Sequence, residues 1–281
     1  MLNVRASDDR SKPPLLLLHG HPQTHLIWHK VWSTLSQTFT LIAPDLRGYG
    51  DSDKPPSDAT VNHAPYSKRE MANDMIAVMR SLGFERFRVL AHDRGARVTH
   101  RMMVDHADSV VRATLLDISP TLAMYEQTTM EFARAYFHWF FLIQREPLPE
   151  MMIESNPEFF LDKMMGNRHA GLAAFAPDVL AEYRRCIRLP GIAHAICEDY
   201  RAAATIDLDH DRADRAAGRK VTQPLQVLWG ANGVIDKCFK PLDDWSRVAL
   251  NVRGRSVPCG HYIPEEAPDA LLDAALPFLR A

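Results

Sequence analysis

Five short apolar runs, each ending in glycine, proline, aspartate or histidine, constrain the fold of this chain more than any other feature. They are PPLLLLHG (13–20), FTLIAPDLRG (39–48), FRVLAHDRG (87–95), RATLLDISP (112–120) and LQVLWGANG (225–233). Their apolar residues are consecutive rather than alternating, which is typical of parallel strands covered on both faces. Helical patterns at 67–84 and 94–107 flank the third run. The alternation predicts an α/β fold with a mostly parallel central sheet flanked by helices.

The alternation stops between residues 120 and 215, where the sequence is helical in pattern and rich in methionine and aromatic residues. We therefore expect an all-helical cap (lid) domain of residues 120–215, inserted into a core domain of residues 1–119 and 216–281. Ligands of open parallel sheets bind at the carboxyl ends of the strands. The cap is expected to cover that edge.

The composition argues against several classes of partner. The formal net charge of −2 gives no reason to expect a nucleic acid or an anionic membrane as partner. The four cysteines are scattered and form no CxxC pair, which indicates free thiols in a reducing compartment. Residues 1–14 are polar, and the aliphatic run after them is too short to span a bilayer. We expect a soluble cytoplasmic protein.

The third run ends in AHDRG (91–95), an aspartate flanked by small residues at a predicted strand-to-helix turn. Such a sharp turn needs small residues because its backbone is crowded. Its central residue, Asp93, is then strained, and its carboxylate is directed into the cleft. The simpler interpretation is that Asp93 only caps the following helix.

Three other segments favour the sharp turn. HGHP (19–22) follows the first run, where a backbone N–H could face the cleft, and DLRGYGDSDKP (45–55) follows the second. CGHYIPEEAP (259–268) places His261 near the C-terminus. A nucleophile in mid-chain followed by a late histidine is the order of the α/β-hydrolase family, which the sequence resembles over nearly its full length.

An aspartate nucleophile changes the expected chemistry. A carboxylate can displace a leaving group from an sp³ carbon, giving an ester that water activated by His261 then hydrolyses. Dehalogenases and epoxide hydrolases of this family work in this way. In both groups the residue after the aspartate is commonly tryptophan, whereas this chain has Arg94.

Arg94 and Arg97 lie one turn apart on the predicted helix. Two guanidinium groups in a cleft need anionic partners, and their planar fork matches a carboxylate. Asp93 can supply one negative charge, and a substrate carboxylate can supply the other. Alternatively, one or both arginines point into solvent.

The segment YFHWFF (136–141) places His138 and Trp139 among aromatic residues, and Tyr200 follows later in the predicted cap. Three neutral N–H and O–H donors would suit a leaving halide ion. Together with HDRGARVTHRM (92–102) and the late histidine, these residues resemble the fluoroacetate (haloacetate) dehalogenases of the α/β-hydrolase superfamily.

This resemblance implies hydrolysis of a small anionic haloacetate to glycolate and halide, without a cofactor or metal, by a homodimer. It implies a role for each matching position: Asp93 as nucleophile, His261 as base, Asp117 as the acid that orients the base, Arg94 and Arg97 as carboxylate ligands, and His138, Trp139 and Tyr200 as halide ligands.

The sequence departs from that pattern or leaves it open at two places. Asp236, in GANGVID (230–236), follows a strand where many α/β-hydrolases carry their acid, so it competes with Asp117. We favour Asp117, because the dehalogenase pattern places the acid there. His21 stands where an aromatic residue such as phenylalanine is usual, which could alter the polarity or specificity of the pocket.

Three other functions compete with this interpretation. HGHPQTH (19–25) could bind zinc through His19 and His21, although no carboxylate lies nearby in the sequence. An epoxide hydrolase would use the same nucleophile and base with tyrosines from the cap, but an epoxide would leave both arginines without a partner. Its candidate tyrosines are Tyr125, Tyr136, Tyr183 and Tyr200. A ligand-binding protein that has lost turnover is the third alternative.

Overall fold

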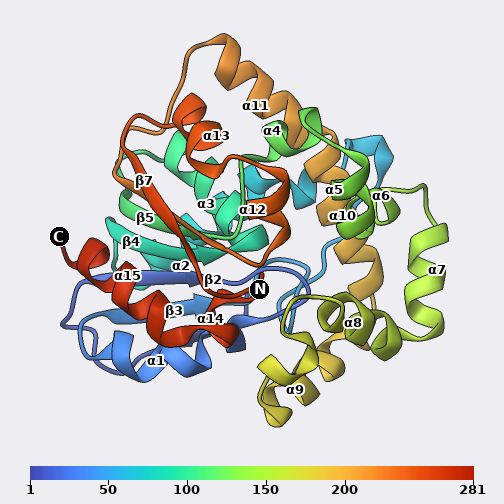
Figure 1. The fold of residues 1–281 in the computed structure, drawn as a ribbon, viewed down its shortest axis with the longest axis horizontal. Helices are drawn as coiled ribbons and strands as arrows, with labels where there is room; N and C mark the ends of the chain where they lie inside the picture. Colours follow the sequence, from blue (N-terminus) through green and yellow to red (C-terminus); the bar gives the residue numbers. More distant parts are fainter.

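The computed structural model describes residues 1–281 and contains one seven-stranded sheet in the order β1-β3-β2-β4-β5-β6-β7. β1 is antiparallel to β3, and every other neighbouring pair is parallel. The prediction of a mostly parallel sheet flanked by helices is therefore confirmed (Figure 1). The strands are β1 (Val4–Ala6), β2 (Pro14–Leu18), β3 (Thr40–Pro44), β4 (Phe87–His92), β5 (Val110–Leu116), β6 (Leu225–Gly230) and β7 (Val252–Val257).

The five apolar runs form β2 to β6, whereas the two edge strands were not predicted. β7 has the sequence VRGRSV and is mostly half-buried or exposed, and β1 has only three residues. An edge strand is paired on one side only and partly faces solvent, so its sequence lacks a continuous apolar run.

The sheet is buried on both faces because successive strand residues point to opposite sides. Leu16 and Leu18 of β2 belong to a core that includes residues of α2 and α3. Leu15 and Leu17 belong to a second core with residues of α1 and α15. The helices of these two layers are α1 (His29–Ser36), α2 (Lys68–Ser81), α3 (Asp93–Asp105), α12 (Val234–Cys238), α13 (Pro241–Val248), α14 (Ile263–Glu266) and α15 (Pro268–Arg280).

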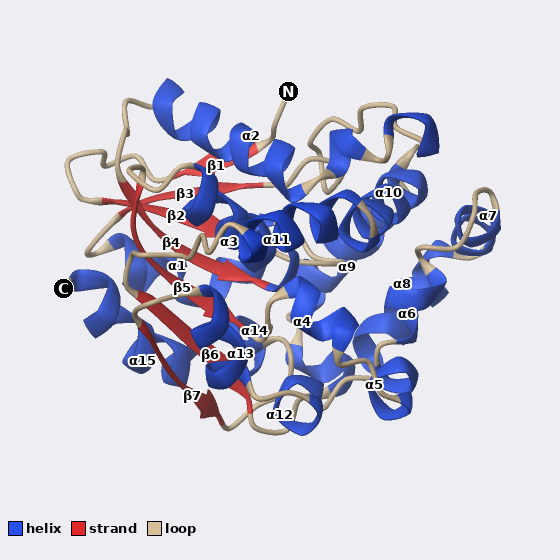
Figure 2. Ribbon diagram, turned by 90° about the horizontal axis from the view of Figure 1, so that it is seen from above, coloured by secondary structure: helices blue, strands red, loops and turns tan.

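Between β5 and β6 the chain is helical. Figure 2 shows that most of these helices gather at one end of the sheet. The helices are α4 (Thr121–Glu126), α5 (Met130–Ala135), α6 (Phe137–Phe141), α7 (Leu148–Ser155), α8 (Pro157–Gly166), α9 (Pro177–Ile187), α10 (Ile192–Ala204) and α11 (Ile206–Ala216). Short 3₁₀ helices lie at His25–Trp28, Ala59–Val61, Ala64–Tyr66 and Gly171–Ala174. None of the helices has both the length and the apolar character needed to cross a bilayer.

Candidate active site

Asp93 lies at the sharp turn between β4 and α3, with a backbone φ of 46°. This positive φ confirms the strain expected from the sequence. A Cβ atom on Gly20 would lie 2.4 Å from Cβ of Asp93, and one on Gly95 would lie 2.5 Å from the carbonyl oxygen of His19. Both approaches are too close for any side chain, so the glycines allow the turn to form.

The carboxylate of Asp93 does not cap α3. It accepts a hydrogen bond at 3.0 Å from the backbone N–H of His21, which lies in the loop that follows β2. Burial alone would raise the pKa of Asp93, but the nearby charges of His261, His92 and the two arginines outweigh it. The pKa therefore lies well below its ordinary value, and the buried group is a carboxylate.

His261 lies beside Asp117, with 2.6 Å between its Nδ1 and Oδ2 of the carboxylate. Oδ1 of Asp117 accepts the backbone N–H of Gly230 at 2.9 Å. Asp117 also has a positive φ of 54°, directly after β5. With Nδ1–H donating to the carboxylate, Nε2 of His261 is the nitrogen left to accept a proton.

The second candidate acid is engaged elsewhere. Oδ1 of Asp236 accepts the indole N–H of Trp229 at 2.7 Å, at an exposed position. The structure therefore brings His261 to Asp117 and not to Asp236.

Arg94 has a carboxylate partner that the sequence analysis did not identify. Its Nε and one terminal nitrogen each donate to the carboxylate of Asp199 at 2.8 Å, and the same terminal nitrogen also donates to the Asp199 carbonyl. Burial lowers the pKa of Arg94, but the charge of Asp199 more than reverses this effect. The expectation that Asp93 and the substrate would be the anionic partners of both arginines is corrected here, because Asp199 holds the fork of Arg94.

Arg97 differs from Arg94 because its bonds run to neutral groups. One terminal nitrogen donates to the hydroxyl of Thr121 at 2.9 Å and to the carbonyl of Ser119 at 3.3 Å, and the other lies 3.2 Å from the sulfur of Met124. Its Nε is buried without a partner, as is the remaining terminal nitrogen of Arg94. Burial lowers the pKa of Arg97, opposed by the charge of Asp93.

The three candidate halide ligands come together on the helical side of the site. The ring centroid of Tyr200 lies 5.8 Å from that of His138 and 6.4 Å from that of Trp139. Tyr200 also lies under the guanidinium of Arg94 at 4.2 Å, and Trp139 under that of Arg97 at 4.7 Å. α6 and α10 therefore carry these side chains to the helix that begins with Asp93.

Two of these residues hold buried polar atoms without a partner, namely Nδ1 of His138 and the indole N–H of Trp139. Burial lowers the pKa of His138 well below its ordinary value, so its ring is neutral. A buried polar group without a hydrogen bond costs a few kcal/mol, and such groups in native proteins usually have a role. Both polar atoms are thus available to a bound ligand.

Sequence reasoning missed Arg168 as well as Asp199, and it named Tyr136 only as a possible donor for an epoxide hydrolase. The hydroxyl of Tyr136 lies 3.4 Å from Nδ1 of His261, and the guanidinium of Arg168 lies 4.2 Å from the centroid of the Tyr136 ring. Asp199 could have been suspected, because it directly precedes Tyr200 in EDYRA. No comparable signal marks Arg168, which lies in the polar segment GNRHAG.

The zinc interpretation of HGHPQTH does not fit the geometry. Nε2 of His19 accepts the backbone N–H of Leu46 at 2.9 Å, its Nδ1 lies 3.0 Å from the Gly20 carbonyl, and His25 pairs with Asp45. No group of three or more histidine, cysteine, aspartate or glutamate side chains is placed to hold a metal ion. His19 is therefore a structural residue that joins two loops.

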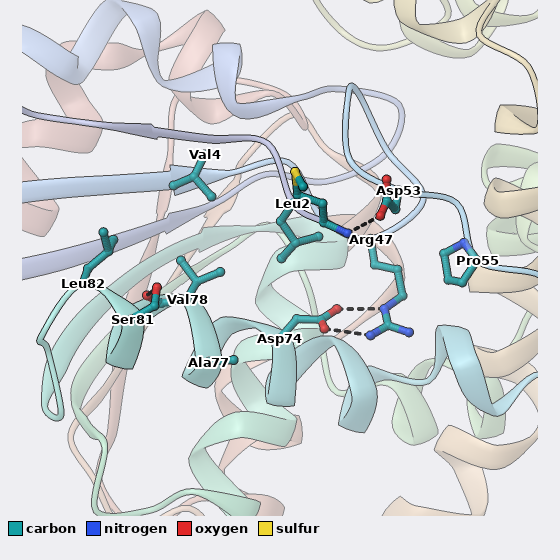
Figure 3. Close-up of a pocket in the computed structure, with 11 residues that line it drawn as sticks. Leu2, Val4, Arg47, Asp53, Pro55, Asp74, Ala77, Val78, Ser81 and Leu82 are labelled. Carbon is teal, nitrogen blue, oxygen red and sulfur yellow. Dashed lines mark hydrogen bonds and ion pairs between the residues drawn. The ribbon is translucent and has the colours of Figure 1, made fainter.

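A surface hollow of about 510 Å³ lies away from these residues, between the N-terminal segment and α2 (Figure 3). An ion pair between Arg47 and Asp74 lies at its edge, with two hydrogen bonds of 2.7 and 2.8 Å. It contains none of the residues predicted for the active site.

Comparison with known proteins identifies the family to which the chain belongs. The family described as having the α/β hydrolase fold matches residues 13–268. Fluoroacetate dehalogenase of Burkholderia sp. is 43% identical over 92% of this chain and 84% of the relative. The soluble epoxide hydrolase of Corynebacterium sp. (strain C12) is 33% identical over 94% of this chain and 89% of the relative.

A solved structure gives the same fold. ALR0039 from Nostoc sp. PCC 7120, described no further than as an α/β hydrolase, superposes with a TM-score of 0.93 and 48% identity, covering 99% of this chain and 98% of that one. The resemblance to fluoroacetate dehalogenases that the motifs indicated is thus confirmed. The chain is a hydrolase and belongs to the α/β-hydrolase fold family.

Proposed function

We propose that this hydrolase is a haloacetate dehalogenase that converts fluoroacetate or chloroacetate and water to glycolate and halide. The observation that carries the proposal is a buried carboxylate on a strained backbone, Asp93, in a site where Nδ1 of His138 and the indole N–H of Trp139 have no partner in the chain. Displacement of a leaving group from carbon requires a carboxylate nucleophile and hydrogen-bond donors that bind the leaving group. Similarity to the fluoroacetate dehalogenase of Burkholderia sp. supports it.

In the first step, a carboxylate oxygen of Asp93 attacks the α-carbon. A C–O bond forms while the carbon–halogen bond breaks, and the halide leaves with the bonding electrons. As negative charge develops on the halogen, it is stabilised by the N–H groups of His138 and Trp139 and the hydroxyl of Tyr200. The product of the step is an ester between Asp93 and glycolate.

In the second step, Nε2 of His261 takes a proton from water, and the resulting hydroxide attacks the carbonyl carbon of the ester. Asp117 holds the ring in the required tautomer through its 2.6 Å contact with Nδ1. The backbone N–H of His21, which donates to Oδ1 of Asp93, is suited to stabilise the oxyanion. The intermediate then collapses, glycolate leaves with the proton from His261, and the carboxylate of Asp93 is restored.

The substrate carboxylate requires a cation that is free to bind it. Arg97 fits this role better than Arg94, because it has no carboxylate partner and its Nε is unpaired. Arg94 offers one unpaired terminal nitrogen, while Asp199 fixes the rest of its guanidinium. We assign Arg97 the principal contact and Arg94 a single additional hydrogen bond.

We also propose that residues 120–215 act as the cap of this site over a core of residues 1–119 and 216–281. The contribution of His138, Trp139 and Tyr200 from α6 and α10 supports this division. A cap that excludes water would strengthen every electrostatic contact to the halide.

Epoxide hydrolysis is the second candidate, favoured by one specific observation. The hydroxyl of Tyr125 is buried without a partner, and its ring lies 5.0 Å from that of Trp139. A tyrosine hydroxyl without a partner, next to Trp139, is a candidate for protonating an epoxide oxygen. Similarity to the soluble epoxide hydrolase of Corynebacterium sp. points the same way.

The deciding experiment measures halide release from chloroacetate and fluoroacetate by ion chromatography, with diol formation from styrene oxide and from an epoxy acid measured in parallel. Asp93→Asn is compared with Asp236→Asn, a carboxamide substitution at an exposed position. We expect halide release by the wild type and by Asp236→Asn, and none above background by Asp93→Asn. Diol formation without halide release would establish the epoxide hydrolase instead.

A further inference from the structure

The side chain of His21 is 4% exposed, and both of its ring nitrogens lack a hydrogen-bond partner. Its backbone N–H is bonded to Asp93, so the residue is held directly beside the nucleophile. Nothing in the mechanism above uses its imidazole ring.

The ring of His21 contacts two of the three proposed halide ligands. Its centroid lies 5.4 Å from that of Tyr200 in an edge arrangement and 6.2 Å from that of His138 in a stacked arrangement. The ring centroid of Tyr49 lies 6.1 Å from that of His21, also in an edge arrangement. The ring therefore forms part of the wall that surrounds the leaving group.

The imidazole of His21 is neutral, because burial lowers its pKa to about 3 despite the opposing charge of Asp93. A neutral imidazole has one N–H donor and one acceptor nitrogen. Leaving both unpaired in a buried site costs a few kcal/mol. Phenylalanine would fill the same space among Tyr49, His138 and Tyr200 without that cost, so the polar ring calls for a ligand.

We propose that His21 is a fourth donor to the departing halide and that it favours carbon–fluorine cleavage over cleavage of the heavier carbon–halogen bonds. The inference rests on the dehalogenase function proposed above. Fluoride is the smallest and most strongly hydrogen-bonded halide, so an additional N–H stabilises its developing charge more than that of bromide. Because this contact strengthens as the bond breaks, it raises kcat rather than lowering KM.

The test compares His21→Phe, which keeps an aromatic ring but removes the N–H, with His21→Gln, which restores a donor. Steady-state kcat and KM are measured on fluoroacetate, chloroacetate and bromoacetate. Removal of one such donor lowers kcat by about 100-fold in comparable sites. We expect a loss of that order on fluoroacetate, less than about tenfold on bromoacetate, and partial recovery with glutamine.

Equal loss of kcat on all three acids would overturn the proposal, as would a rise in KM alone, which would place His21 at the substrate carboxylate. Thermal unfolding of each variant and of the control His106→Asn, a half-buried histidine bonded to Asn73, separates these effects from misfolding.

A readout without turnover distinguishes failure of this inference from failure of the proposed function. Binding of sodium fluoride and sodium bromide to the free protein is followed by tryptophan fluorescence, since Trp139 is 1% exposed within the site. Weaker fluoride binding by His21→Phe than by the wild type supports the fourth donor even if haloacetates are not substrates. Equal fluoride affinity in both proteins would overturn it whether or not halide is released.

Discussion

The two carboxylates on the sheet side of the candidate active site differ from the donors on its helical side in how their polar atoms are bonded. On the sheet side, both carboxylate oxygens of Asp117 are bonded, one to His261 and one to the backbone of Gly230, and Asp93 accepts the backbone N–H of His21. On the helical side, His138 and Trp139 carry buried polar atoms without any partner. The two carboxylates are internally satisfied, whereas the helical donors are complete only when a ligand is bound, as are the unpaired nitrogens of His21, Arg94 and Arg97 on the sheet side.

This difference separates two tasks within one site. Groups that must hold a fixed geometry through the reaction are fixed by short hydrogen bonds and by backbone strain at Asp93 and Asp117. In the proposed mechanism, the groups that meet a changing charge are those left without a partner. The following predictions test where the division lies, starting with the largest expected effect.

Asp117→Asn should remove the partner that orients His261 and lower kcat by about 10,000-fold, as expected for the acid of a catalytic triad. Asp236→Asn, at the competing position, should leave kcat within about threefold of the wild type, because its carboxylate bonds only to Trp229. Both are measured by halide release from chloroacetate. The reverse order of effects would show that Asp236 is the functional acid.

Asp199→Asn should leave Arg94 buried without its counter-charge. Breaking a buried ion pair on one side costs about 3–5 kcal/mol of unfolding free energy, measurable by urea denaturation. Asp209→Asn, at an exposed position on α11, serves as control and should cost less than about 0.5 kcal/mol. If Asp199→Asn lost no more stability than Asp209→Asn, the pair would contribute little to the connection between α10 and the core.

Trp139→Phe keeps an aromatic ring beneath Arg97 but removes the unpartnered N–H. We expect kcat to fall by about 100- to 1,000-fold, since the donor acts on charge that develops in the transition state. Trp229→Phe is the matched control, because its N–H bonds to Asp236 away from the site. A change confined to KM would assign Trp139 to ground-state binding.

Low pH should destabilise the protein because the unfolded chain binds protons that its buried histidines do not. His100 lets this effect be measured at a position outside the candidate active site. Burial lowers its pKa to about 3 from an ordinary value of 6.5, and its ring packs against Trp245 at 5.1 Å. Between these values the unfolded chain binds a proton that the folded chain does not, so stability falls as pH falls.

His100→Gln should therefore reduce the dependence of the unfolding free energy on pH by up to about 1.4 kcal/mol per pH unit between pH 6 and 4. Denaturant titrations at several pH values measure it. The depressed pKa of Asp93 acts in the same sense, but only as pH falls through and below about 3.8, so it does not contribute over most of this window. An unchanged slope would mean that His100 is protonated in the folded state.

The sequence predicted the buried strands and the turn at Asp93 better than the edge strands and the long-range contacts of the helical segment. Buried parallel strands and the glycines around Asp93 leave local signatures, so β2 to β6 and the turn could be identified directly. The edge strands β1 and β7 could not, because half-exposed strands carry mixed sequences. The partner of Arg94 lies 105 residues away, and only the packing of α10 onto α3 brings Asp199 to it.

The hydrogen bonds that Asp199 accepts also bear on how the site could open. Its carboxylate accepts hydrogen bonds from Tyr49, Lys68 and Arg94, all from outside the helical segment, and it directly precedes Tyr200. Detaching α10 would break all three of these contacts to one buried carboxylate, which therefore hold the helix against the core. If the proposed dehalogenase opens to admit small acids, we expect the helices before α10 to move, while Tyr200 stays anchored to the core through its neighbour Asp199.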